Sequence, residues 1–427
     1  MNNKTNKIDL MKKLLTLLVC VGAALTLHAQ EISMGGGGVE NPTINPDNSV
    51  TFTFNAPNVA TIELDGEFLP PREIRTQQGT RTTTRTPLAK SADGVFTLTT
   101  PPLESDFYTY NLYMDGVRVV DPNNVYQNRD VANLINYFII GGGHGDLFDV
   151  QDVPHGNVSK VWYPSPRAKM AQRRMSVYTP AGYNAADRRT KYPVLYIMHG
   201  IGGDENAWID GGRVPQVLDN LIASGAAEKM IVVVTNSNMS QQASPGDAPA
   251  SRHRPQLMVP GNMDGQFEES FLDVVEFIES NYNVYKDKAH RALAGLSMGG
   301  YGTMFYTMRH PELFSSACPI SARMSGTPYN KNRSYTDEYI TTLDSLAGVK
   351  IAQSLSDEQI AALRKVRLRV DCGDDDYLFD GNIDFVRALR SHKIPVELRV
   401  RDGGHSWIYW QTALPDILTY VSIGFME

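Results

Sequence analysis

Cysteine is scarce in this sequence, with three in 427 residues. Cys20 lies in an N-terminal segment that we expect to be removed, whereas Cys318 and Cys372 lie in apolar runs typical of buried strands. An exported protein could form a disulfide, but a cysteine in a buried strand behaves as a small apolar residue. We therefore predict two buried free thiols.

Basic residues are also outnumbered, because 40 Lys and Arg face 47 Asp and Glu, a formal net charge of -7. Residues 1–29 hold four Lys and one Asp, so their removal brings the charge to -10. An acidic protein is a poor partner for nucleic acid. With 42% hydrophobic and 20% charged residues, the composition is that of a globular protein, not of a disordered one.

The N-terminus contains an apolar run that is interpreted separately from the rest of the chain. "MKKLLTLLVCVGAALTLHAQ", residues 11–30, joins a Lys-rich start to an apolar stretch that ends in small residues. This pattern predicts a signal peptide over residues 1–29, cleaved near Ala29, and hence a secreted or periplasmic protein with no membrane span after cleavage. A permanent membrane anchor is the alternative, but the run is short for a spanning helix.

The rest of the chain is long enough for two domains. Short alternating runs such as "SVTFTFNAPN" and "FYTYNLYMDG" fill residues 48–113 between turn signals, which is typical of antiparallel strands. We predict an all-β immunoglobulin-like sandwich over residues 30–140, with the polar tract 76–87 as an exposed loop. The Gly-rich stretch over residues 141–156 is the predicted linker.

After the linker the pattern changes. Continuous apolar runs such as "KYPVLYIMHG" and "VRLRVDCG" alternate with amphipathic segments such as "FEESFLDVVEFIESNY". Strands that are apolar throughout are buried on both faces, and their alternation with helices predicts a doubly wound, mostly parallel sheet. Residues 157–427 are therefore expected to form an α/β domain.

The motif G-x-S-x-G occurs between a predicted strand and a predicted helix, in "HRALAGLSMGGYGTMFY", residues 290–306. Between a buried strand and a helix it predicts a nucleophile elbow, where Gly295 and Gly299 leave room for a tight turn and Ser297 is exposed as a nucleophile. The N-terminus of the helix would face the charge that develops during reaction. A plain Gly-rich turn is the alternative.

A serine nucleophile needs a base and an acid, which follow it in the chain in this kind of site. His405, in "RDGGHSW", directly follows the last predicted strand and is the candidate base. His199, His290 and His310 lie at strand or helix ends and are expected to be structural.

The acid should follow the strand "VRLRVDCG", where Asp374, Asp375, Asp376 and Asp380 are all available. Spacing does not choose among these four. A calcium loop is the alternative, but "DDDYLFDGN" does not reproduce the ligand spacing of a known one. We expect neither a metal nor a cofactor.

An oxyanion hole would use the backbone N–H of Met298 and a second N–H from the loop "IMHGIGGDENAW", where Ile201 is the candidate. We also assign Gly200 and Trp208 of this loop to substrate binding, although a simple turn and a core aromatic would explain them as well. The long polar segment of residues 240–261 is expected to border the site.

Taken together, "YIMHGIGGDENAW", "FIESNYNVYKDKAHRALAGLSMGGYGT", "CGDDDYL" and "GGHSW" resemble the esterase D-like α/β-hydrolases, and specifically the bacterial feruloyl esterases of carbohydrate esterase family one. The resemblance runs from Val158 to the C-terminus and implies an α/β-hydrolase fold. It implies that Asp376, the last residue of C-G-x-x-D, is the acid beside Ser297 and His405, with Met298 and Ile201 as oxyanion donors.

The N-terminal half resembles immunoglobulin-like modules related to family-48 carbohydrate-binding modules, which implies either glycan binding or a structural role. The whole resemblance implies a secreted serine esterase that releases ferulate from plant arabinoxylan, with an acylated polysaccharide or oligosaccharide as its partner. The alternatives are an acetyl-xylan or siderophore esterase, an acyltransferase, and a non-catalytic glycan-binding protein. No long apolar insertion suggests the lipid groove of an acyltransferase, and the order Ser, Asp, His argues against a non-catalytic protein.

Overall fold

The computed structural model describes residues 40–76, 79–131, 133–239, 241–249, 266–325 and 344–426. The predicted signal peptide lies outside these residues, as does most of the polar segment 240–261 that was expected to border the site. None of the helices within the described ranges is long and apolar enough to span a membrane.

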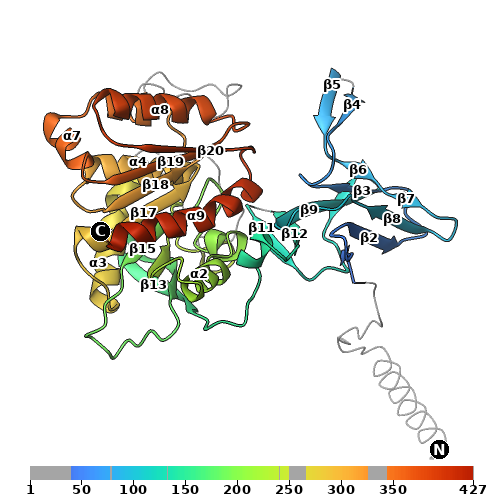
Figure 1. Cartoon of the computed structure of the whole chain (residues 1–427), viewed down its shortest axis with the longest axis horizontal. Helices are drawn as coiled ribbons and strands as arrows, with labels where there is room; N and C mark the ends of the chain where they lie inside the picture. The colour runs from blue at the N-terminus through green and yellow to red at the C-terminus, as the bar shows by residue number, and fades with distance from the viewer. Residues whose placement is uncertain are drawn as a thin grey trace, which may run out of the picture. The chain divides into compact units, whose positions relative to one another are not determined.

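Residues 41–139, called here the all-β part, form two main antiparallel sheets (Figure 1). The alternation of apolar and polar residues seen in the sequence places Phe52, Leu64 and Leu112 in the buried core of this part. The first sheet has the order β1 (Thr43–Ile44), β2 (Val50–Asn55), β8 (Val95–Thr99), β7 (Ala89–Lys90). The second has the order β11 (Gln127–Asp130), β12 (Asn133–Ile139), β9 (Phe107–Met114), β3 (Ile62–Asp65), β6 (Thr86–Pro87), and β10 (Val117–Val119) pairs with β9. The all-β prediction is confirmed.

The polar tract 76–87 is not the plain loop that we expected. Strands β4 (Arg72–Thr76) and β5 (Gly79–Thr83) pair as a hairpin, and β6 adds to the second sheet. Threonine is β-branched and favours extended backbone although it is polar. A tract without apolar residues can therefore still form strands, and the hydrophobic pattern alone does not reveal them.

The predicted linker, residues 141–156, is packed against the chain that follows it. It contains a short 3-10 helix, η1 (His144–Leu147), and Phe148 is fully buried. The Asn220 side chain donates hydrogen bonds to the carbonyls of Asp146, Leu147 and Asp149. From Asn41 onward the chain groups into one compact unit. The division into two domains stays a prediction, but this segment is no free tether.

Residues 157–426, called here the α/β part, contain an eight-stranded sheet with the order β13-β14-β16-β15-β17-β18-β19-β20. Strand β14 is antiparallel to both of its neighbours, β13 and β16. The other strands, β16, β15, β17, β18, β19 and β20, are parallel to one another. The strands are β13 (Asn157–Ser165), β14 (Met170–Thr179), β15 (Val194–Met198), β16 (Ile231–Val234), β17 (Arg291–Leu296), β18 (Ser316–Ile320), β19 (Arg367–Gly373) and β20 (Glu397–Arg401).

Helices cover both faces of this sheet (Figure 1). In β15, Leu195 and Ile197 pack with α2 and α9, whereas Val194 and Tyr196 pack with α3 on the other face. The helices are α2 (Val214–Ala223), α3 (Gln266–Asn281), α4 (Met298–Arg309), α6 (Gly348–Gln353), α7 (Asp357–Leu363), α8 (Phe379–Ser391) and α9 (Trp407–Met426), with shorter turns η2 (Ala207–Gly211) and η4 (Lys288–His290). The predicted doubly wound α/β-hydrolase architecture is confirmed.

Cys318 in β18 and Cys372 in β19 are buried and free. Burial raises the pKa of both thiols well above the usual range. The prediction of two buried free thiols is confirmed.

Candidate active site

The parallel strands end along one edge of the sheet, and the predicted triad residues lie there. Ser297 follows β17, Asp376 lies three residues after β19, and His405 lies four residues after β20. Strands β17, β18, β19 and β20 are consecutive neighbours in the sheet. The carboxyl ends of neighbouring parallel strands bring residues that are distant in sequence to one crevice.

The turn that holds Ser297 is strained and tightly packed. Ser297 has a φ of 54°, in the region that L-residues rarely adopt. A Cβ on Gly295 would collide with the carbonyl of Gly299, and a Cβ on Gly299 would lie 2.5 Å from the carbonyl oxygen of Met198. Both glycines of the motif are therefore required by the close approach of backbone, as a nucleophile elbow requires.

The three predicted triad residues are hydrogen-bonded in series. His405 Nε2 lies 3.0 Å from Ser297 Oγ, and His405 Nδ1 lies 2.9 Å from Asp376 Oδ2. Nδ1 must carry the proton to donate to the carboxylate, so Nε2 is free to accept the serine proton. This is the relay that activates a serine hydroxyl.

Asp376 is set apart from the other acids of its loop. Its exposed fraction is 4%, whereas Asp374, Asp375 and Asp380 are exposed. Burial by itself would raise the pKa of Asp376, but the hydrogen bond and charge of His405, with the Leu378 N–H, outweigh burial and lower the pKa. Of the four acids that spacing left open, Asp376 is the one that contacts His405, and its role as the triad acid stays a prediction.

The two predicted oxyanion donors lie on either side of the nucleophile. Met298 begins α4 directly after Ser297, and Ile201 lies on the loop after β15. This loop passes close to the nucleophile, since a Cβ on Gly200 would lie 3.3 Å from Ser297 Cβ. Within the described part of the chain, neither N–H donates a hydrogen bond. Both are available to a developing negative charge.

A cavity of about 450 Å³ opens above Ser297 and His405. Gly200 and Ile201 line it, but Trp208 does not. Trp208 is fully buried, donates its indole N–H to the carbonyl of Met198 at 2.9 Å and packs edge-on against Trp407. The assignment of Trp208 to substrate binding was therefore wrong, because in the loop after β15 the bulky ring turns inward to fill the core.

Much of the cavity wall was not predicted from the sequence. Tyr377 and Trp410 flank the His405 ring at centroid distances of 4.7 and 4.9 Å, and Trp407 also lines the cavity. The aromatic letters beside "CGDDD" and "GGHSW" were a usable signal for these three. The all-β part supplies a further set for which the sequence carried no signal: Glu67, Thr109, Asp130, Val131 and Ile135.

The other histidines have structural surroundings, as expected. His199 is fully buried, its Nδ1 donates to the carbonyl of Gly200, and its Nε2 accepts the Ser237 N–H at 2.9 Å. Burial lowers its pKa, so the ring stays neutral. His290 stacks on Tyr285, and His310 ends α4.

One acidic cluster near the triad has the donor set of a cation site. Oxygens of Asp374, Asp375 and Asp402 lie within 4.8 Å of one another, and all three residues are exposed. Exposed carboxylates often cluster without an ion, so we assign no metal role to this group.

A family model described as "Putative esterase" matches residues 168–421. An endo-1,4-β-xylanase/feruloyl esterase of Xylanibacter ruminicola is 30% identical over 66% of this chain and 36% of that protein. An acetyl esterase of Caldicellulosiruptor saccharolyticus is 21% identical over 53% of this chain and 82% of that protein. The chain thus matches about a third of the length of the xylanase relative.

Two solved structures of esterases are also similar to this chain. A ferulic acid esterase is 34% identical, with a TM-score of 0.52, and covers 64% of this chain and 99% of its own. The enterobactin esterase FES of Shigella flexneri is 15% identical, with a TM-score of 0.59, over 87% of this chain and 93% of its own. The second likeness concerns the fold alone, but it extends over more of the chain than the first.

Proposed function

The chain belongs to the esterase family whose model spans residues 168–421, and we propose that it is a secreted serine carboxylesterase that releases hydroxycinnamates, mainly ferulate, from acylated arabinoxylan or its oligosaccharides. The observation that carries the proposal is the hydrogen-bonded series Ser297, His405, Asp376 beneath a cavity walled by aromatic side chains. The feruloyl esterase relatives support the choice of acyl group.

In the proposed reaction, Ser297 Oγ attacks the ester carbonyl carbon while His405 Nε2 accepts the hydroxyl proton. The carbonyl oxygen becomes negatively charged and receives hydrogen bonds from the N–H groups of Met298 and Ile201. His405 then protonates the departing sugar alkoxide, which leaves an acyl-Ser297 intermediate. A water molecule, deprotonated by His405, hydrolyses that intermediate and restores the serine. Asp376 holds the imidazole tautomer and stabilises its positive form.

The cavity wall suits an aromatic acyl group on a polyhydroxylated alcohol. Tyr377, Trp407 and Trp410 offer flat apolar surfaces, and the carboxylates of Glu67 and Asp130 can accept hydroxyl donors. No Lys or Arg belongs to the described residues that line the cavity. This wall would repel an anionic acyl group, which favours a neutral hydroxycinnamate ester.

An acetyl-xylan esterase is the second candidate, because an acetyl esterase is among the relatives. A cavity of about 450 Å³ falls within the usual size range of sites for small organic ligands, and an acetyl group would leave most of it empty. The volume and the aromatic wall therefore favour the larger acyl group.

A substrate panel tests the proposal on the purified mature chain. We expect kcat/KM for methyl ferulate to exceed that for methyl acetate by about 100-fold, because burial of a ring contributes roughly 2–3 kcal/mol. Acetylated xylan and feruloylated arabinoxylan oligosaccharides complete the panel, with release of acetate and ferulate measured by chromatography. Acetate release without ferulate release would instead identify an acetyl-xylan esterase.

A further inference from the structure

The loop that carries Ile201 also carries two consecutive acidic residues, Asp204 and Glu205. Both are fully buried, with exposed fractions of 0%. A buried carboxylate is costly unless it is paired and hydrogen-bonded. The loop can therefore keep its course only if partners reach both carboxylates.

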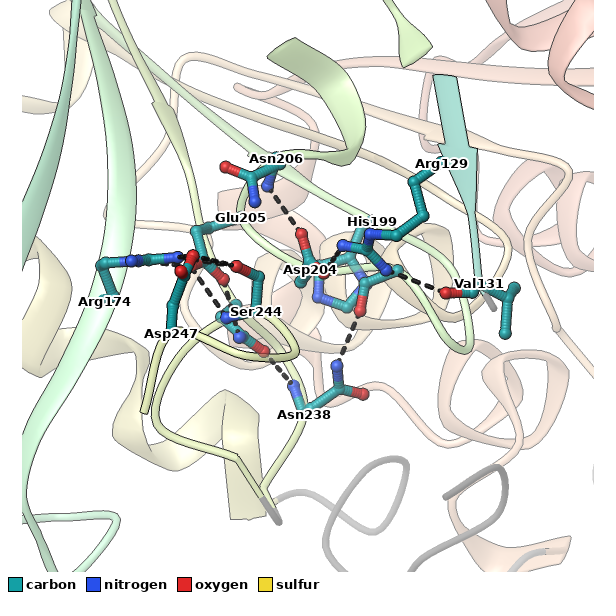
Figure 2. A network of polar contacts seen from close by, with 12 residues as sticks. Arg129, Val131, Arg174, His199, Asp204, Glu205, Asn206, Asn238, Ser244 and Asp247 are labelled. Carbon is teal, nitrogen blue, oxygen red and sulfur yellow. Dashed lines mark hydrogen bonds and ion pairs between the residues drawn. The ribbon is translucent and has the colours of Figure 1, made fainter. Parts of the chain in front are cut away.

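Glu205 obtains its partners from the α/β part. Arg174 of β14 donates to it at 2.6 Å, the Asn236 side chain at 2.8 Å, and the Ser244 N–H at 3.0 Å. Arg174 also pairs with Asp247 (Figure 2). Burial and the neighbouring charge of Asp204 both raise the pKa of Glu205. A second carboxylate beside it would therefore be especially unfavourable without a partner of its own.

Asp204 obtains its counter-charge from the all-β part. Arg129, in β11, reaches across and forms an ion pair with Asp204 Oδ2, while Asp204 Oδ1 accepts the Asn206 N–H at 2.9 Å. The other Arg129 nitrogen donates to the carbonyl of Val131 at 2.8 Å (Figure 2). Among the described residues, Arg129 is the cation that forms an ion pair with Asp204.

The residues that follow Arg129 lie against the same site. Asp130 accepts the indole N–H of Trp407 at 3.2 Å, and Trp407 lies two residues after His405. Val131 lines the cavity with a φ of 53°, which is unfavourable for a β-branched residue. The end of β11 thus contacts the Ile201 loop on one side and the His405 segment on the other.

We propose that Arg129 is a positioning residue of the ester hydrolysis reaction: its ion pair with Asp204 holds the Ile201 loop beside Ser297. Asp204 lies three residues after Ile201, and hydrogen bonds fix the backbone between them. Gly203 donates its N–H to the carbonyl of Gly200 at 3.1 Å, and the Asn238 side chain donates to the carbonyl of Gly203 at 2.7 Å. A displacement of Asp204 would therefore displace the Ile201 N–H.

The consequence is that the all-β part takes part in catalysis without contacting the reacting atoms. If Arg129 is lost, the buried Asp204 carboxylate lacks a counter-charge beside Glu205 and is driven toward water, with the loop. Arg129 itself does not line the cavity, so its loss removes no direct contact with the substrate. The inference rests on the proposed role of Ile201 as an oxyanion donor.

The experiment compares three variants on p-nitrophenyl acetate, a small ester without a sugar group. Arg129→Met removes the charge and keeps the length of the side chain. Arg129→Met combined with Asp204→Asn also removes the buried charge, and the Asn side chain can still accept the Asn206 N–H. Arg72→Met is the matched control, since Arg72 lies in the same all-β part and pairs with Glu63, and neither residue lines the cavity.

We expect Arg129→Met to lower kcat by about 10- to 100-fold with KM within about twofold, because misplacing one donor by about an ångström has an effect of this size. Affinity for phenylboronic acid, which forms a tetrahedral serine adduct, should fall by a similar factor. The double variant should recover kcat to within about fivefold of wild type, and Arg72→Met should match wild type.

A wild-type kcat in a folded Arg129→Met protein would overturn the inference, as would a folded double variant no better than the single one. If Arg129→Met does not fold, the double variant decides alone: near-normal kcat supports the inference, and a loss of 100-fold or more refutes it. These outcomes are separate from the proposed function, which is tested on the wild-type chain alone and fails if that chain releases no ferulate from feruloylated substrates.

Discussion

Among single residues, burial separates Asp376 from the acids beside it. The loop places four carboxylates within seven positions, yet the chain turns Asp376 inward, where the Leu378 N–H and His405 both donate to it. Against the effect of burial, the hydrogen bond and the charge of His405 lower the pKa of Asp376, which favours its ionised form. An ionised, oriented carboxylate is what the imidazole needs to hold its proton on Nδ1.

Asp376→Asn should therefore lower kcat on methyl ferulate by ~10⁴, because an amide at this position favours the wrong imidazole tautomer. Asp374→Asn and Asp375→Asn are matched controls on the same loop, and each should change kcat by less than about threefold since both side chains are exposed. The three values are measured at one pH, with circular dichroism to verify folding. A severe defect in either control beside a near-normal Asp376→Asn protein would place the acid elsewhere on the loop.

Single residues also show what could and could not be predicted about the site from the sequence. Ser297 and His405 are local signals, since each sits in a short motif next to a recognisable strand. Asp376 needed the family resemblance, because four acids satisfy the same spacing. Trp208 was misassigned, since a motif does not tell whether a ring points into a cavity or into the core.

At the scale of elements, the elbow between β17 and α4 depends on space that only glycine leaves. Gly299→Ala would place a Cβ 2.5 Å from the carbonyl oxygen of Met198, so we expect a loss of stability of about 1–3 kcal/mol, as for other overpacked sites, together with most of the activity. Thermal unfolding followed by circular dichroism measures the change.

Gly381→Ala, within α8, is the matched control. The nearest atom to a Cβ on Gly381 lies 3.7 Å away, and its φ is not in the left-handed region. Alanine in a helix is favoured over glycine by roughly 0.5–1 kcal/mol, so this variant should melt at a slightly higher temperature. Equal destabilisation by both substitutions would show that the elbow geometry is not the cause.

Secondary structure was predictable wherever the apolar pattern was strong. Strands β15, β16, β17, β18, β19 and β20 and helices α3 and α8 follow directly from continuous apolar runs and amphipathic segments, whereas β13 and β14, which mix polar and apolar residues, were not predicted. The hairpin β4–β5 was not predictable in this way, because its threonines form strands with no apolar face to mark them.

At the scale of the whole molecule, the all-β part and the α/β part share a core. Phe107, Tyr137 and Phe148 belong to the same buried cluster as Leu218 of α2 and Trp410 of α9. Contacts between positions so far apart in sequence leave no periodic trace, so the sequence suggested two separable domains. Neither the shared core nor the contribution of Glu67 and Asp130 to the cavity could be foreseen. Glycan binding by the all-β part stays a prediction.

A chain that starts at Asn157 should therefore be impaired. It would expose apolar core surface on α2 and α9 and lack both Arg129 and the Asp130 partner of Trp407. We expect lower solubility, a lower melting temperature, and a kcat on p-nitrophenyl acetate reduced at least as much as by Arg129→Met. A soluble truncated chain with wild-type kcat would show that the two parts work independently.

We propose that Ser297 is the nucleophile of an esterase that acts on hydroxycinnamates, and the most direct test is kcat of the Ser297→Ala protein on methyl ferulate. The side chain is small and contributes little packing, so the variant should keep the wild-type circular dichroism spectrum. Removing such a nucleophile typically lowers kcat by ~10⁶, so we expect turnover below about one part in a thousand of wild type. Residual turnover above that level in a folded Ser297→Ala protein would contradict covalent catalysis at this serine.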